Sequence, residues 1–149
     1  MGTQISGLRV FAAVFVVGVI VNYVWELAQA PLFSGSTPGN VWWHCFVASL
    51  GDGLILLLIL VIGWCTHRRL VWFFKPGISA YAVMIVSGIL IAIVIEWIAV
   101  HVAHRWSYAA AMPLLPVLDI GLVPVAQMVL LPPLIFRVAG AWITRRVQA

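Results

Sequence analysis

The sequence predicts an all-α membrane protein in which four transmembrane helices form one bundle. Hydrophobic residues make up 64% of the chain, charged residues make up only 8%, and the mean hydropathy is +1.15. A soluble domain has about a quarter of its residues charged, so this chain cannot cover itself with polar side chains. Four apolar stretches are each long enough to cross a hydrocarbon core of about 30 Å. We expect the 149 residues to form a single domain over 1–149.

The first apolar stretch covers residues 10–30. It ends in "AQA", which resembles a signal-peptide cleavage site, but the stretch is longer than the apolar core of an ordinary signal peptide. We therefore expect it to be retained as a membrane span. The second and third spans are predicted at residues 42–65 and 78–100.

The fourth span, predicted at residues 114–137, contains Pro116, Pro124, Pro132 and Pro133. A proline removes the N–H donor for the carbonyl four residues earlier, so the carbonyls of Met128 and Val129 lose their helical partners. In lipid these groups need partners within the protein. We therefore predict a fourth helix kinked by prolines, which either lines a cavity or is a tolerated distortion.

The basic residues predict the orientation of the bundle. Arg105 follows the third span, whereas all other Lys and Arg residues fall at the opposite ends of the spans: Arg9, Arg68, Arg69, Lys75, Arg137, Arg145 and Arg146. The positive-inside rule then places both termini in the cytoplasm of a multi-pass cell-membrane protein, such as one of the bacterial inner membrane. Because these cations lie at helix ends, they indicate contact with the lipid bilayer and no nucleic-acid partner.

All four carboxylates of the chain fall inside or at the edge of a predicted span: Glu26, Asp52, Glu96 and Asp119. An ionisable group within a span costs about 3 kcal/mol or more unless it is paired or hydrated, so it indicates a functional site. With His44, His101 and His104, these acids fall in the outer leaflet of the predicted topology. We expect a shared polar cavity near the extracytoplasmic face, the alternative being separate interfacial side chains that reach headgroup water.

Helical periodicity places several polar residues on common faces. Asn22, Glu26 and Gln29 share a face of the first helix. Cys45, Ser49 and Asp52 share a face of the second. If the third helix continues beyond its apolar part, Trp97, His101 and His104 also share a face.

One function predicted from these residues is acid–base catalysis on a lipid-soluble substrate, for example the isomerisation, cyclisation or hydration of an isoprenoid. Glu96 and Asp52 are the predicted acid and base, with Glu26 and His44 in support. Aromatic residues near them could stabilise a developing carbocation. The predicted ligand-binding residues are Trp25, Trp43, Trp97, Tyr108, Asn22 and Gln127. This reaction requires no cofactor.

Two other functions fit the same sequence. A divalent metal could be bound by His101 and His104 of "HVAH", completed by His44 or Glu26, and haem would need two facing histidines such as His44 and His101. Alternatively, the small, aromatic-rich chain is a non-catalytic subunit of a membrane complex, an ion-conducting element or a homo-oligomer.

One segment resembles a known family. "EWIAVHVAHRWSY", followed by "GLVP", is similar to part of the small membrane lycopene cyclases, in which an acid in a helix precedes a Trp-aromatic pair and a Gly/Pro-led helix that carries acids. The resemblance covers about thirty residues and implies a cyclase that acts on an isoprenoid. Where that family has consecutive acids after the proline, this chain has Val125, Ala126 and Gln127. No residue roles are taken from the resemblance.

Overall fold

The computed structural model describes residues 6–34 and 39–148, with the side chains of 147 and 148 left aside. Within these residues, four helices are long and apolar enough to cross a membrane: α1 (Gly7–Gln29), α2 (Val41–His67), α3 (Ile78–Trp97) and α4 (Leu122–Gln148). A 3₁₀ turn, η1 (Ala30–Leu32), extends α1, and a π-helical turn, η2 (Ile98–Val102), extends α3. The predicted four-helix, all-α architecture is confirmed, and the protein is a multi-pass membrane protein by the length and composition of these helices.

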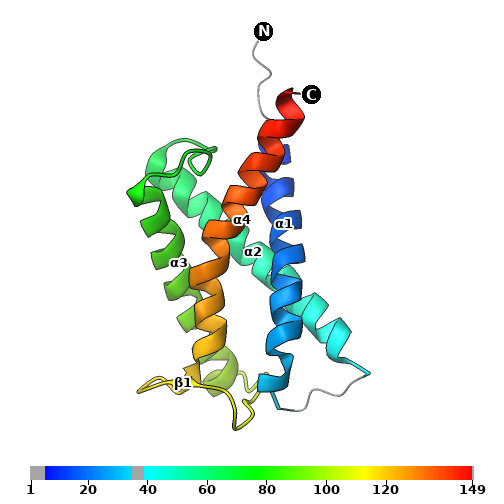
Figure 1. Ribbon diagram of the computed structural model, residues 1–149. Coiled ribbons are helices and arrows are strands. Elements are labelled where there is room, and N and C mark those ends of the chain that lie inside the picture. Colours follow the sequence, from blue (N-terminus) through cyan, green and yellow to red (C-terminus); the bar gives the residue numbers. More distant parts are fainter. Residues whose placement is uncertain (1–5, 35–38, 149) are drawn as a thin grey trace.

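The helices run alternately up and down, so that α1 begins and α4 ends at the same end of the bundle (Figure 1). Helix α1 packs against α2 and α4, and α3 packs against α4 and α2. Half of the α4 span is buried, compared with a third of each other span. Large apolar side chains such as Ile20, Leu54 and Leu90 face outward, as lipid-facing positions do.

The fourth helix differs most from its prediction, because it begins at Leu122 rather than residue 114. Residues 114–121 form a short antiparallel hairpin of β1 (Leu114–Leu115) and β2 (Ile120–Gly121). Val117 and Asp119 have φ angles of 73° and 48°, which a continuing helix would not allow. Asp119 is consequently an exposed turn residue instead of a group inside a span.

Pro132 and Pro133 lie inside α4, and the helix continues on both sides of them. The Met128 carbonyl, which Pro132 deprives of its helical donor, lies against Gly88 of α3, where a Cβ atom would overlap it. Close approach at glycine lets polar backbone of one helix be covered by another. Gly88 and Ala92 therefore serve packing within this chain, with Ala92 in a buried cluster that includes Met128.

The loop between α2 and α3 covers the end of the bundle with aromatic side chains. Trp72 and Phe73 are buried, and the Trp72 ring occupies the space that a side chain at Gly63 would fill. The indole Nε1 of Trp72 donates to the Leu60 carbonyl at 3.2 Å. This loop is thus a packed cap, whereas its composition alone would suggest an interfacial segment.

At the opposite end of the bundle, backbone hydrogen bonds join the loop that follows α1 to the loop that follows α3. Phe33 and Tyr108 form an isolated antiparallel bridge. The amide of Ser34 donates to the Ser107 carbonyl at 2.8 Å, and the amide of Ala109 donates to the Leu32 carbonyl at 2.9 Å. The two loops therefore lie on one side of the membrane, as the alternating topology requires, and Tyr108 is fixed next to the ends of α1 and α3.

Candidate functional site

The main polar feature of the bundle is a cluster of five side chains from three helices, here called the amide–carboxyl network. Its members are Asn22, Glu26 and Gln29 of α1, Asp52 of α2 and Gln127 of α4. The exposed fractions of Asn22, Gln29 and Gln127 are 1%, 4% and 2%, so water does not reach these amides from outside. Such a cluster inside a membrane bundle satisfies each polar group from within the protein.

Gln127 is the centre of the network. Its Nε2 atom lies 2.8 Å from Asn22 Oδ1, 3.2 Å from Glu26 Oε1 and 2.9 Å from Asp52 Oδ2. Its Oε1 atom accepts a hydrogen bond from Gln29 Nε2 at 3.1 Å. A single amide of the last helix therefore holds the polar faces of the first two helices together.

The α1 members are positioned by helical spacing and by local hydrogen bonds. Asn22 Nδ2 donates to the Gly18 carbonyl at 2.8 Å, which orients Asn22 Oδ1 toward Gln127. Gln29 Nε2 also donates to Glu26 Oε1 at 2.8 Å, and Trp25 Nε1 donates to Gln29 Oε1 at 3.2 Å. The predicted common face of Asn22, Glu26 and Gln29 is the face that meets α4.

Gln127 has fewer N–H hydrogens than the acceptor oxygens that surround its amide nitrogen. Gln127 Nε2 carries two hydrogens, yet three acceptor oxygens lie within hydrogen-bonding distance of it. The carboxyl groups of Glu26 and Asp52 are two of these three acceptors, so both are held at the same amide nitrogen. Two ionised carboxylates at one nitrogen would repel one another in a low-dielectric interior, and a proton on one of them would remove that repulsion.

A second polar group surrounds Glu96 in the last turn of α3. Tyr108 donates its hydroxyl hydrogen to Glu96 Oε2, and Trp106 Nε1 donates to the same oxygen at 3.4 Å. Glu96 has an exposed fraction of 7%. The aromatic donors come from the loop after η2, and the Tyr108 ring lies close to Gly121 of β2.

Tyr108 lies outside the spans, but burial raises the pKa of its phenol well above the usual range, and the hydrogen bond to Glu96 raises it further. The phenol therefore remains a hydrogen-bond donor to Glu96 throughout the physiological pH range.

The structure brings together some of the predicted site residues and separates others. Glu26, Asp52, Asn22 and Gln127 are in the network, with Trp25 beside them. Glu96 and Tyr108 form the second group, so the predicted acid–base pair of Glu96 and Asp52 is divided between two clusters. The remaining predicted residues are exposed, away from both groups: Trp43, Trp97, His44, His101 and His104.

The two histidines of "HVAH" do not share a helical face, because regular helix ends at Val102 and His104 has a φ of 47°. His101 Nε2 lies 3.0 Å from the Leu118 carbonyl, and its ring is 5.8 Å from that of Trp97. In the described part of the chain, no three His, Cys, Asp or Glu side chains gather in a way that could hold a metal ion.

Two contributors, Gln29 and Trp106, were not among the predicted site residues. Gln29 shares the face of Asn22 and Glu26, so its spacing was a usable signal. Trp106 reaches Glu96 only because the chain turns back after η2, which the sequence does not indicate.

Two cavities of the described residues lie away from both polar groups. The larger lies beside the loop between α2 and α3, and the other is an apolar groove lined by α2 and α3. The three amide residues of the amide–carboxyl network are buried, whereas Glu26 and Asp52 are partly exposed. No protein-family model, curated protein or solved structure matches this chain.

Proposed function

We propose that this protein is an intramembrane acid–base enzyme that acts on a lipid-soluble substrate, and that Glu26 and Asp52 share the proton it transfers. The observation that supports this most is the crowding of acceptor oxygens around Gln127 Nε2, with two carboxyl groups among them. Purely structural polar contacts between membrane helices do not need two carboxyl groups from different helices.

The shared proton provides both partners of an acid–base reaction. One carboxyl of the pair can donate the proton to a substrate, and the other can accept a proton from a different substrate atom. Gln127 and Gln29 would hold the two carboxyl groups in fixed positions during the exchange. Glu96, held by Tyr108 and Trp106, is the second acid–base group of the site.

The chemistry that suits this arrangement is the isomerisation, cyclisation or hydration of an isoprenoid. Shifting a double bond adds a proton to one carbon and removes a proton from another, so it balances without a co-reactant. Trp25 and Trp106 adjoin the two groups and could stabilise a transient carbocation. The substrate would enter laterally from the bilayer and reach Glu26 and Asp52, which are partly exposed on the membrane-spanning helices α1 and α2.

We further propose that both termini are cytoplasmic and that α4 is kinked at Pro132 and Pro133. The support for the orientation is the accumulation of Lys and Arg at one end of the bundle. In this orientation the two polar groups lie in the extracytoplasmic half of the membrane, within the cell membrane of a bacterium. The support for the kink is the pair of carbonyls that lose helical donors.

The proposal is tested by the apolar lipids of the source cells. Cells without the gene would be complemented with the wild type, Glu26→Gln, Asp52→Asn or Asp119→Asn, and their lipid extracts compared by mass spectrometry. Asp119 is the matched control, because it is an exposed acid on the same side of the bundle. We expect the wild type and Asp119→Asn to restore the same lipid species, and Glu26→Gln and Asp52→Asn to accumulate its precursor. Identical extracts from all strains, at equal protein levels, would refute catalysis.

The shared proton has its own test. A protonated carboxyl gives a separate C=O stretching band in the infrared spectrum. We expect the purified wild type to show this band at neutral pH and Asp52→Asn to lose or shift it, while Asp119→Asn leaves it unchanged. A spectrum that is the same in wild type and Asp52→Asn would show that the pair holds no proton.

A second function, that of an accessory subunit, is favoured by one observation. Every buried side-chain N or O atom in the described residues has a hydrogen-bond partner, as a network that only locks helices together would. That function predicts a stoichiometric protein partner after purification in mild detergent, and wild-type lipid profiles in the Glu26→Gln and Asp52→Asn strains.

A further inference from the structure

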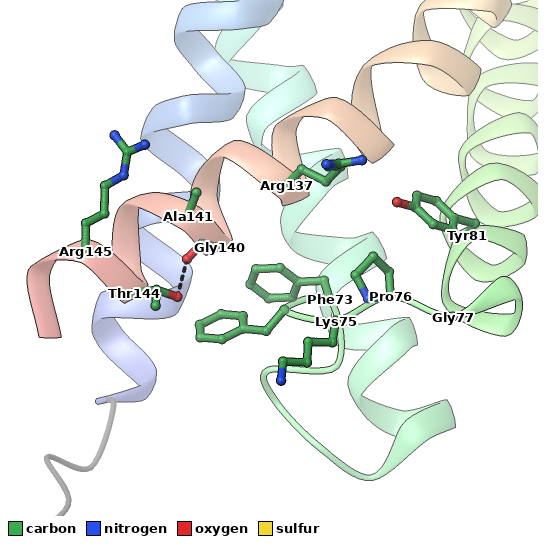
Figure 2. Close-up of a pocket in the computed structure, with 11 residues that line it drawn as sticks. Phe73, Lys75, Pro76, Gly77, Tyr81, Arg137, Gly140, Ala141, Thr144 and Arg145 are labelled. Carbon is green, nitrogen blue, oxygen red and sulfur yellow. Dashed lines mark hydrogen bonds between the residues drawn. The ribbon is translucent and has the colours of Figure 1, made fainter. Parts of the chain in front are cut away.

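A cavity lies far from both polar groups, at the end of the bundle where α3 begins and α4 approaches its end. It has a volume of about 690 Å³. Figure 2 shows Lys75, Pro76 and Gly77 of the α2–α3 loop on one side and α4 on the other. Its floor is apolar, with Phe73 and Phe74 in edge-to-face contact at 5.2 Å between ring centroids. On the α4 side, the lining residues Gly140 and Ala141 have little or no side chain and so leave the cavity open.

The rim of this cavity is cationic. Lys75, Arg137 and Arg145 line it, and none of its lining residues is acidic. All four carboxylate side chains of the chain belong to other segments, three in or beside the two polar groups and Asp119 in the hairpin. The cations of the cavity therefore have no carboxylate side chain among its walls to neutralise them.

Arg137 and Tyr81 define the inner part of the cavity. Their guanidinium and hydroxyl groups point toward one another in Figure 2, while Lys75 extends from the loop and Arg145 projects outward. Arg137 precedes Arg145 by two helical turns, so it lies about 12 Å closer to the membrane centre. A guanidinium at that depth, beside a phenol, provides N–H and O–H donors suited to a phosphate oxygen.

Near the same end of α4, Trp142 and Arg146 form a pair that is typical of the membrane interface. Trp142 is 38% exposed, and the Arg146 guanidinium lies 5.5 Å from its ring centroid. Tryptophan and arginine pairs of this kind prefer the headgroup region of a bilayer. The cavity therefore opens at the depth at which lipid phosphates lie, and its apolar floor continues toward the acyl chains.

We propose that this cavity binds the phosphate of an anionic phospholipid headgroup, with Arg137 and Tyr81 as inner ligands and Lys75 at the rim. Basic pockets between transmembrane helices on the cytoplasmic side are suited to such headgroups. The chemistry shared with a soluble ligand is the phosphate itself. The apolar floor and the depth of Arg137 favour the lipid as its source.

The test uses full-length protein, delipidated in neutral detergent, and native mass spectrometry with added phosphatidylglycerol or phosphatidylcholine. We expect phosphatidylglycerol to bind at least about tenfold more tightly, because each basic residue near an anionic headgroup contributes about fivefold in affinity. Arg137→Gln and Lys75→Gln should each weaken this binding about fivefold, and the double variant about 25-fold. Circular dichroism would establish that each variant keeps its helices.

Arg69→Gln is the matched control, because Arg69 is an exposed cation of the same loop that does not line the cavity. It should keep the preference for phosphatidylglycerol. Equal binding of the two lipids would overturn the proposal, as would an Arg69→Gln variant as impaired as Arg137→Gln. Inorganic phosphate or glycerol 3-phosphate would be added as competitors. Displacement of the lipid at millimolar concentration would assign the site to a soluble phosphate and overturn the lipid assignment.

Discussion

Replacing Gln127 by methionine should destabilise the bundle by about 2–5 kcal/mol. The amide uses both N–H hydrogens and its carbonyl oxygen in the network, so the change removes three hydrogen bonds at once. A hydrogen bond between membrane helices contributes about 0.6 kcal/mol on average and about 1.7 kcal/mol at most. The loss therefore lies between about 2 and about 5 kcal/mol. Methionine is close in length and fills the space, so the cavity contribution is small.

The measurement is reversible unfolding in mixed micelles with increasing dodecyl sulfate, followed by circular dichroism. Leu130→Met is the matched control, because Leu130 is a 57% exposed residue of the same helix, and its free energy of unfolding should stay within about 0.5 kcal/mol of wild type. If Gln127→Met unfolded at the same detergent fraction as Leu130→Met, the amide would not hold the helices together. The donor count on which the shared proton depends would then also be wrong.

Two further predictions concern a packing contact and an alkaline transition. Gly88→Ala should lower the free energy of unfolding by about 1–3 kcal/mol, because its Cβ would overlap the Met128 carbonyl and α3 must move away. Gly51→Ala is the control and should be neutral, because there is open space around the added atom. Equal effects of the two substitutions would contradict this account. For Tyr108, the folded-state pKa lies above the unfolded value of about 10, so its contribution to stability is complete below pH 10 and declines as the pH rises above it. Tyr108→Phe should therefore show a smaller loss of stability than wild type between about pH 10 and 12 in the same unfolding assay, and identical slopes would count against a buried phenol.

Most of the fold follows from the length of apolar stretches. The first three spans were predicted to within a few residues of α1, α2 and α3, because the hydrocarbon thickness leaves little freedom in where such helices end. The start of α4 was wrong, because the apolar residues before it are as compatible with a helix as with a hairpin. The positive φ angles of Val117 and Asp119 are compatible with the hairpin and not with a helix, and composition does not reveal backbone angles.

The candidate site was only partly predictable. Depth in the membrane indicated that Glu26 and Asp52 lie in the same leaflet, and periodicity indicated the polar face of α1. Which face of each helix turns inward depends on the packing of all four, so the partnership of Asp52 with Gln127 could not be read from either helix alone. The return of the chain after η2 carried Tyr108 to Glu96 and left His101 and His104 exposed.

The position of Gln127 in the last helix has a consequence for how the protein is made. Asn22 and Gln127 are 105 residues apart in the chain, so the ribosome delivers the acidic and amide faces of the first two helices to the membrane long before their partner exists. Helices α1 and α2 can associate as a hairpin in the meantime, but Asp52 then lacks its amide donor. Until α4 is inserted, Asn22, Glu26 and Asp52 therefore lack the amide donor that Gln127 provides in the finished bundle.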